Sequence, residues 1–192
     1  MKKWILFFNI LFFAPMCSCS SDDLSGQNSI RFGDDTFTIE KAYYIFDFTD
    51  FRYQEFLVIL TDGSIESFFI PANDYVFSPE TQNVLLLRAR IFDEEQAATI
   101  QLPTGSFVYG NRFETDSLVF LRLQQGCQSL ENEALEDCLE IVDLPFVENS
   151  SGLMEIVSRS SQNSYEINLN INFSGELTLS GTYSGSVLTF NK

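Results

Sequence analysis

The 192-residue sequence predicts one all-β domain, a single antiparallel sandwich or barrel of about ten strands. Aromatic residues make up 15% of the chain, and 20 residues are phenylalanine. This favours sheets, because flat rings pack well on pleated surfaces. Short apolar runs recur about every 8–12 residues, with turn-forming residues between them. No linker divides the chain, so we expect one domain with one core.

The first 18 residues are predicted to be a signal peptide. Lys2 and Lys3 supply positive charge, and an apolar run follows over 4–13. This run is long enough for the core of a signal peptide and too short to span a bilayer. Residues 19–29 are rich in Ser, Asp and Gly, which is typical of a flexible tether. The folded domain is therefore expected to cover 30–192.

A small residue before a cysteine, at the end of the apolar run, resembles a bacterial lipobox. Cys19 follows Ser18 and fits this pattern, whereas Cys17 follows Met16 and is the alternative acceptor. The resemblance implies acyl chains on the cysteine, and two or more chains anchor a protein stably. An ordinary secretory signal is the other interpretation, although no A-x-A cleavage site is visible.

The residues after Cys19 also carry a resemblance. Ser20-Ser21-Asp22-Asp23 is similar to the acidic export tag of surface lipoproteins of the Bacteroidota. This similarity implies an outer-membrane lipoprotein displayed at the cell surface, with the periplasmic face as the alternative location. A plain solvated tether would have the same composition.

Strands are expected where apolar residues alternate with polar ones or form short runs. In 165–173 the alternation predicts one buried face and one wet face. Residues 56–60 are apolar on both faces, so this strand should be covered on both sides or line a cavity. Asp62-Gly63 is expected to form a tight hairpin turn. The expected strands are 37–48 (one strand or a bent pair), 53–60, 64–70, 84–92, 99–102, 106–109, 117–123, 139–142, 153–158, 165–173 and 177–190, the last bending at its glycines.

Cys127 and Cys138 are predicted to form a disulfide, because an exported protein folds in an oxidising compartment. One short helical turn is expected between them, with Ser129 as its cap and Glu131 in its first turn. A redox-active pair is the alternative, but the spacing is not that of a C-x-x-C motif.

The charge and the missing histidine exclude several functions. The sequence has 27 acidic and 11 basic residues, a net charge of −16, and no histidine. Such a surface repels DNA, RNA and anionic headgroups, so no nucleic-acid partner is expected. Without histidine there is no Ser-His-Asp or Cys-His triad and no usual zinc site. We therefore expect no metal and no cofactor.

The C-terminal part resembles the ending of many uncharacterised Bacteroidota lipoproteins, which implies an exported β-rich domain without an assigned activity. The matching motifs are Ser151-Gly152, Tyr165-Glu166-Ile167, Gly181-Thr182-Tyr183-Ser184-Gly185 and Leu102-Pro103-Thr104-Gly105-Ser106-Phe107.

Three residues are candidates for ligand contact. Tyr183 lies between two glycines, which suits a ring platform for a sugar or, as the favoured interpretation, a corner of the barrel or sandwich. Arg88 and Arg90 share one face of their strand and are expected to face solvent or contact an anion. Asp116-Ser117-Leu118 is similar to the O-glycosylation acceptor pattern of the Bacteroidota, which makes sugar on Ser117 a hypothesis.

These features predict a non-catalytic binding or accessory lipoprotein, held at a membrane by its lipid. Its ligand would be a glycan, a protein or a small apolar molecule. A structural envelope or adhesion component is the alternative function. Less favoured is a glycoside hydrolase that works with two carboxylates. Asp47 would be its acid, because the surrounding aromatic residues would raise its pKa.

Overall fold

The computed structural model describes residues 28–49, 53–69, 74–92, 101–110, 116–128, 137–145, 150–160, 163–173 and 177–190. Within these ranges the secondary structure consists of strands, which confirms the all-β prediction. Cys17, Cys19 and the expected helical turn lie outside the described residues. The strands are β1 (Ser29–Phe32), β2 (Asp35–Thr38), β3 (Lys41–Thr49), β4 (Gln54–Thr61), β5 (Ile65–Phe69), β6 (Asp74–Phe77), β7 (Val84–Ile91), β8 (Gly105–Tyr109), β9 (Ser117–Gln128), β10 (Asp137–Pro145), β11 (Ser151–Ser158), β12 (Ser164–Asn172) and β13 (Thr178–Phe190).

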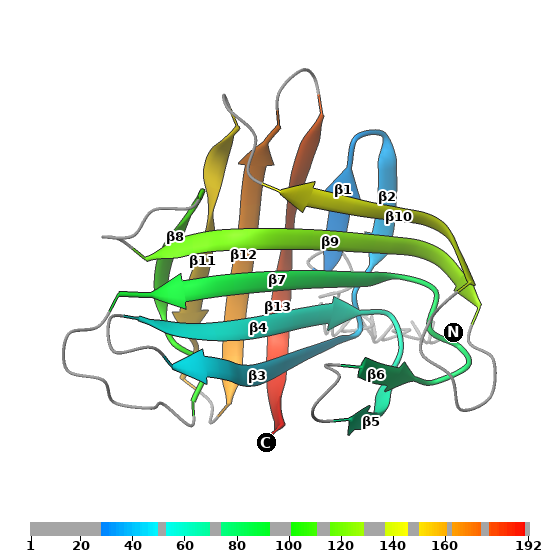
Figure 1. Cartoon of the computed structure of the whole chain (residues 1–192), viewed down its shortest axis with the longest axis horizontal. Coiled ribbons are helices and arrows are strands. Elements are labelled where there is room, and N and C mark those ends of the chain that lie inside the picture. The colour runs from blue at the N-terminus through cyan, green and yellow to red at the C-terminus, as the bar shows by residue number, and fades with distance from the viewer. Residues whose placement is uncertain are drawn as a thin grey trace, which may run out of the picture.

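Eight of these strands close into a barrel, in the order β13-β12-β11-β8-β9-β7-β4-β3 and back to β13. In Figure 1, β3, β4, β7 and β9 run across the front, and β8, β11, β12 and β13 run up and down behind them. Each set is antiparallel internally. The pairings that join the two sets, β8 with β9 and β13 with β3, are parallel. The sequence did not predict these two parallel junctions.

The remaining strands add to the barrel from outside. The β1–β2 hairpin extends the back set beside β13, and β10 pairs with β9. β5 and β6 form a separate hairpin, whose Ile65 and Phe77 pack with Leu57 and Ile59 on the outer face of β4. The opposite face of β4 belongs to the barrel core. The expectation that residues 56–60 are covered on both sides is thus confirmed.

Side chains fill the interior of the barrel. Phe56 of β4 meets Phe107 of β8 edge to face, with ring centroids 5.2 Å apart, and Tyr44 of β3 lies 5.8 Å from Phe56. Tyr109 donates a hydrogen bond to the Leu144 carbonyl at 2.8 Å, and burial raises its pKa to about 12, so the phenol keeps its proton. A barrel of eight strands is either filled by side chains or holds one small ligand. Here buried side chains from all eight barrel strands form one cluster. The interior is therefore a core.

The structure also corrects several strand predictions. Asp62-Gly63 does not close a hairpin, because β4 pairs with β7 and the chain leaves the barrel at this point to form β5 and β6. The segment 37–48 is a bent pair, with the break at Ile39 and Glu40 between β2 and β3. Of 99–102, the described residues Gln101 and Leu102 are outside any strand. Strands β1 and β6 were not expected, and β9 extends five residues beyond its predicted end.

Candidate functional site

Tyr183 lies inside the barrel rather than on its surface. Its side chain is 2% exposed and belongs to the core, and its hydroxyl donates to the Ser186 carbonyl at 2.8 Å. A Cβ at Gly185 would come within 2.7 Å of the Tyr183 hydroxyl, so glycine makes room for this ring. After this point β13 changes its partner from β12 to β3. The corner interpretation fits this placement, and a ring this deeply buried offers no platform to a sugar.

The two arginines of β7 are engaged within the protein. Arg90 Nη2 lies 2.6 Å from Glu55 Oε1, both side chains are largely covered, and the guanidinium sits 4.1 Å from the centre of the Tyr53 ring. Arg88 is half-buried and also has contacts within the chain. The expectation that Arg90 faces solvent is therefore wrong, because the acid and the ring across the strands cover it.

The structure assigns no functional role to Ser117 or to Asp47. Ser117 begins β9 between β7 and β8 and has no exposed area. A sugar on its hydroxyl would have to be attached before this part of the barrel folds. Asp47 falls at an irregularity in the pairing of β3 with β4, between Phe46 and Phe48. Its side chain lies outside what the structure describes.

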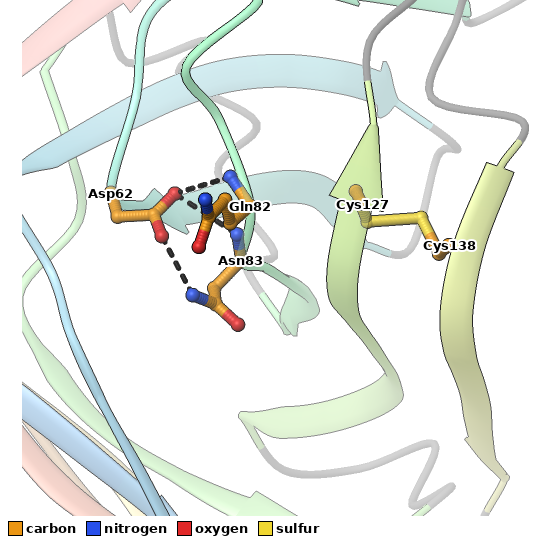
Figure 2. Close-up of a disulfide and its surroundings, with 5 residues drawn as sticks. All are labelled: Asp62, Gln82, Asn83, Cys127 and Cys138. Atoms are coloured by element: carbon orange, nitrogen blue, oxygen red, sulfur yellow. Dashed lines mark hydrogen bonds between the residues drawn. A yellow bond between two sulfur atoms is a disulfide. The ribbon is translucent and has the colours of Figure 1, made fainter.

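The predicted disulfide is present. Cys127 of β9 and Cys138 of β10 are directly opposite each other and are joined by an S–S bond (Figure 2). Cys127 is 3% exposed, and its N–H donates to the Gln82 carbonyl at 3.0 Å. The bond thus fixes the end of β9 to β10, beside the segment that leads into β7. Burial of a sulfur in this way is typical of a structural disulfide.

A polar groove opens next to this disulfide. Its volume is about 530 Å³, and one wall is β2. The other wall comes from the ends of the front strands and the segment before β7. Of the side chains that line it in the described part of the chain, only that of Phe37 is aromatic, and it is directed into the core. The groove is lined by Asp35, Thr36, Phe37, Thr38, Asp62, Gln82, Asn83, Gln125 and Gly126.

Asp62 builds the wall opposite β2. One carboxylate oxygen accepts the backbone N–H groups of Gln82 and Asn83, each at 2.9 Å, and the other accepts the Asn83 side-chain amide at 2.6 Å (Figure 2). Gly63 follows because a Cβ there would clash with Thr81. The Asp62 carboxylate thus joins the end of β4 to the segment that leads into β7, and this segment forms part of the groove wall.

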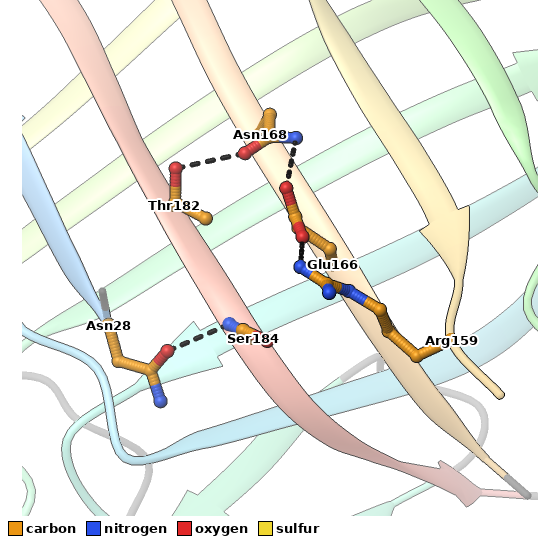
Figure 3. A network of polar contacts seen from close by, with 6 residues as sticks. All are labelled: Asn28, Arg159, Glu166, Asn168, Thr182 and Ser184. Carbon is orange, nitrogen blue, oxygen red and sulfur yellow. Dashed lines mark hydrogen bonds and ion pairs between the residues drawn. The ribbon is translucent and has the colours of Figure 1, made fainter. Parts of the chain in front are cut away.

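A second polar surface covers the outer face of β12 and β13 (Figure 3). Arg159 is ion-paired with Glu166, the Asn168 amide donates to Glu166, and the Thr182 hydroxyl donates to Asn168 at 2.9 Å. Asn28 accepts the Ser184 N–H at 2.7 Å. This is the wet face predicted for 165–173. Its polar groups bond to one another, so it makes a weaker candidate site than the groove.

Nothing in the sequence pointed to the groove. Asp35, Asp62 and Gln125 are far apart along the chain and share no motif. The described ranges contain no group of three or more His, Cys, Asp or Glu that is arranged to hold a metal ion. They also contain no helix of the length and apolar character that a membrane crossing requires.

Comparisons with known proteins leave the site to be interpreted from its own chemistry. No family model, no curated protein and no solved structure matches the chain.

Proposed function

We propose that the chain is a membrane-anchored, non-catalytic lipoprotein that binds a segment of another protein in the groove beside β2. The observation that carries this proposal is the composition of the groove: one wall is the edge of a strand, and the other carries the side-chain amides of Gln82, Asn83 and Gln125, of which that of Asn83 is bonded to Asp62. Strand edges bind other chains through backbone hydrogen bonds. Asp62 already accepts three hydrogen bonds within the fold, which favours a structural role over acid–base catalysis.

The other ligands suggested by the sequence fit less well. Sugars are usually held against exposed rings, but all seven tyrosines are described and each is buried or half-buried. The only tryptophan is Trp4, within the expected signal peptide. A small apolar ligand would need space inside the barrel, which is packed with side chains such as Phe56 and Phe107. These facts favour a protein ligand.

The membrane anchor is tested by metabolic labelling with radioactive palmitate. We expect the wild-type protein and Cys17→Ser to be labelled and to sediment with membranes, since the lipobox resemblance favours Cys19 as the acceptor. Cys19→Ser should be unlabelled. Labelling of Cys19→Ser together with loss of label in Cys17→Ser would move the acceptor, and no label in the wild-type protein would remove the anchor.

The groove is tested by site-specific photo-crosslinking in intact cells. A benzoylphenylalanine at Gln82, an exposed residue of the groove wall, should give a discrete crosslinked band. The same group at Asn170, which is exposed on the outer face of β12, is the matched control and should give none. The Gln82 band should disappear in Thr36→Arg, which fills the groove from the β2 side. No Gln82 band, or equal bands at both positions, would contradict the proposal.

A further inference from the structure

The backbone of β2 has one edge bonded to β1 and one edge directed away from it. Ile39 N–H donates to the Asn28 carbonyl at 2.8 Å, just beyond the paired residues of β1 and β2. Hydrogen-bonded and non-hydrogen-bonded pairs alternate in an antiparallel ladder. Phe37 and Asp35 therefore direct their backbone groups at β1, and Thr36 and Thr38 direct theirs away from it.

A contact between β1 and β13 independently shows which residues of β1 bond to β2. Gly33 N–H donates to the Thr178 carbonyl of β13 at 3.0 Å, so alternate residues of β1 from Gly33 backward bond to β13. The intervening residues, Phe32 and Ile30, are left to bond to β2. Among the described residues β2 ends the sheet and pairs with β1 alone. The N–H and C=O groups of Thr36 and Thr38 thus form the outer edge of β2.

This outer edge runs along the groove. All four residues of β2 line it, although side chains of successive strand residues point to opposite faces. All four can therefore line the groove only because their shared backbone edge faces it. Four residues extend over about 13 Å. Across the groove lie the side-chain amides of Gln82 and Gln125, which can both donate and accept, and that of Asn83, which already donates to Asp62. A strand inserted here would find hydrogen-bonding groups on both of its edges.

The charge of the groove indicates which kind of peptide strand would bind there. Among the described residues that line the groove are the carboxylates of Asp35 and Asp62 and no lysine or arginine, within a chain of net charge −16. Asp35 is exposed, whereas the neighbouring Asp34 in the β1–β2 turn is already paired with Arg31 at 3.8 Å, so Asp35 is the carboxylate available at this edge. Two copies of this chain would repel each other at such an edge, whereas a basic segment would be attracted.

We infer that the outer edge of β2 binds an extended, lysine- or arginine-bearing peptide segment as an added β-strand. This inference rests on the proposed function and names the ligand class of the same groove. The peptide would bond through its backbone to Thr36 and Thr38, and its cationic side chains would lie near Asp35. Affinity would come from the backbone pairing and selectivity from the charge.

The inference is tested with the mature, lipidated protein in detergent micelles and a fluorescein-labelled hexapeptide of alternating lysine and threonine. Fluorescence anisotropy should show binding that weakens as salt is added. On binding, amide hydrogen exchange should slow at Thr36 and Thr38 and stay unchanged at Asp35 and Phe37, which are already bonded to β1. The glutamate–threonine hexapeptide should not bind.

Two variants separate backbone pairing from charge attraction. Thr36→Pro removes one outward N–H without touching a bond to β1, and proline is tolerated on edge strands, so we expect binding about tenfold weaker. Thr36→Ala is the matched control and should bind like the wild-type protein. If Thr36→Pro does not fold, the lysine–threonine peptide methylated at every backbone nitrogen takes its place. It keeps its charge but loses every backbone donor, so it should bind the wild-type protein more than tenfold more weakly than the unmethylated peptide does.

The possible failures are distinguishable. Binding that leaves exchange at Thr36 and Thr38 unchanged, or that is equal for the methylated peptide, would overturn strand addition. A dimer in sedimentation that Thr36→Pro abolishes would identify a second copy as the occupant and would also overturn it. If neither hexapeptide binds but the Gln82 crosslink forms, the inference fails and the proposed function stands. If that crosslink is absent, the proposed function fails as well.

Discussion

Replacing Phe107 with alanine is expected to lower the free energy of unfolding by about 3–5 kcal/mol, the usual cost of deleting a fully buried aromatic ring. Phe107 has no exposed area and contacts Phe56 edge to face at 5.2 Å. The first ring belongs to β8 in the back set and the second to β4 in the front set. The substitution would therefore leave a cavity between the two halves of the barrel. Urea denaturation followed by circular dichroism measures the change.

Phe120→Ala is the matched control for this variant. Phe120 lies on β9, is half-buried, and sits beneath the Arg122 guanidinium at 5.7 Å on the outer face. Its loss should cost about 1 kcal/mol, since the protein around an outer side chain can relax and solvent already reaches it. If Phe107→Ala costs no more than Phe120→Ala, the barrel interior is not a packed core.

Removing the disulfide should have the second largest effect. The Cys127→Ala/Cys138→Ala double variant is expected to have a free energy of unfolding about 3 kcal/mol lower than that of the wild-type protein, because the bond closes a loop with a sequence separation of 11. Alanine is used because a serine hydroxyl at the buried Cys127 position would add a cost of its own. Urea denaturation with and without dithiothreitol measures the effect.

The reductant provides the control. It should destabilise the wild-type protein by a similar amount and leave the double variant unchanged. The loss should also loosen the groove, because Gln125 and Gly126 directly precede Cys127 on β9. A wild-type protein whose unfolding midpoint does not move on reduction would show that β9 and β10 are held by other contacts, such as the two-pronged Arg122–Asp143 pair.

The Arg122–Asp143 pair should make the attachment of β10 to β9 weaker at low pH. The hydrogen bond from Arg122 lowers the pKa of Asp143. The stability that this pair contributes is therefore present above the ordinary aspartate pKa and is lost as the pH falls through the lowered pKa. The two side chains are about half exposed, which makes their contribution small. The disulfide is thus expected to dominate the attachment of β10.

Much of the fold was predictable from local patterns. The alternation in 165–173 predicted the two faces of β12, and the run 56–60 predicted a strand that is covered on both sides or lines a cavity. Both predictions were possible because every second residue of a strand faces the same side. The disulfide followed from two cysteines in an expected oxidising compartment. The net charge alone argued against nucleic-acid binding, and the absence of histidine alone excluded the catalytic triads that depend on it.

Long-range pairing decided the rest. Local patterns do not record which strand lies beside which, so the parallel junctions and the departure of the chain at Asp62 came only from the tertiary structure. The same holds for Tyr183 and Arg90, whose neighbours across the sheet decide whether they meet solvent or core. The groove could not be predicted from the sequence for the same reason. Its walls come from residues 35–38, 62, 82–83 and 125–126, and only the closing of the barrel brings the free edge of β2 opposite those amides.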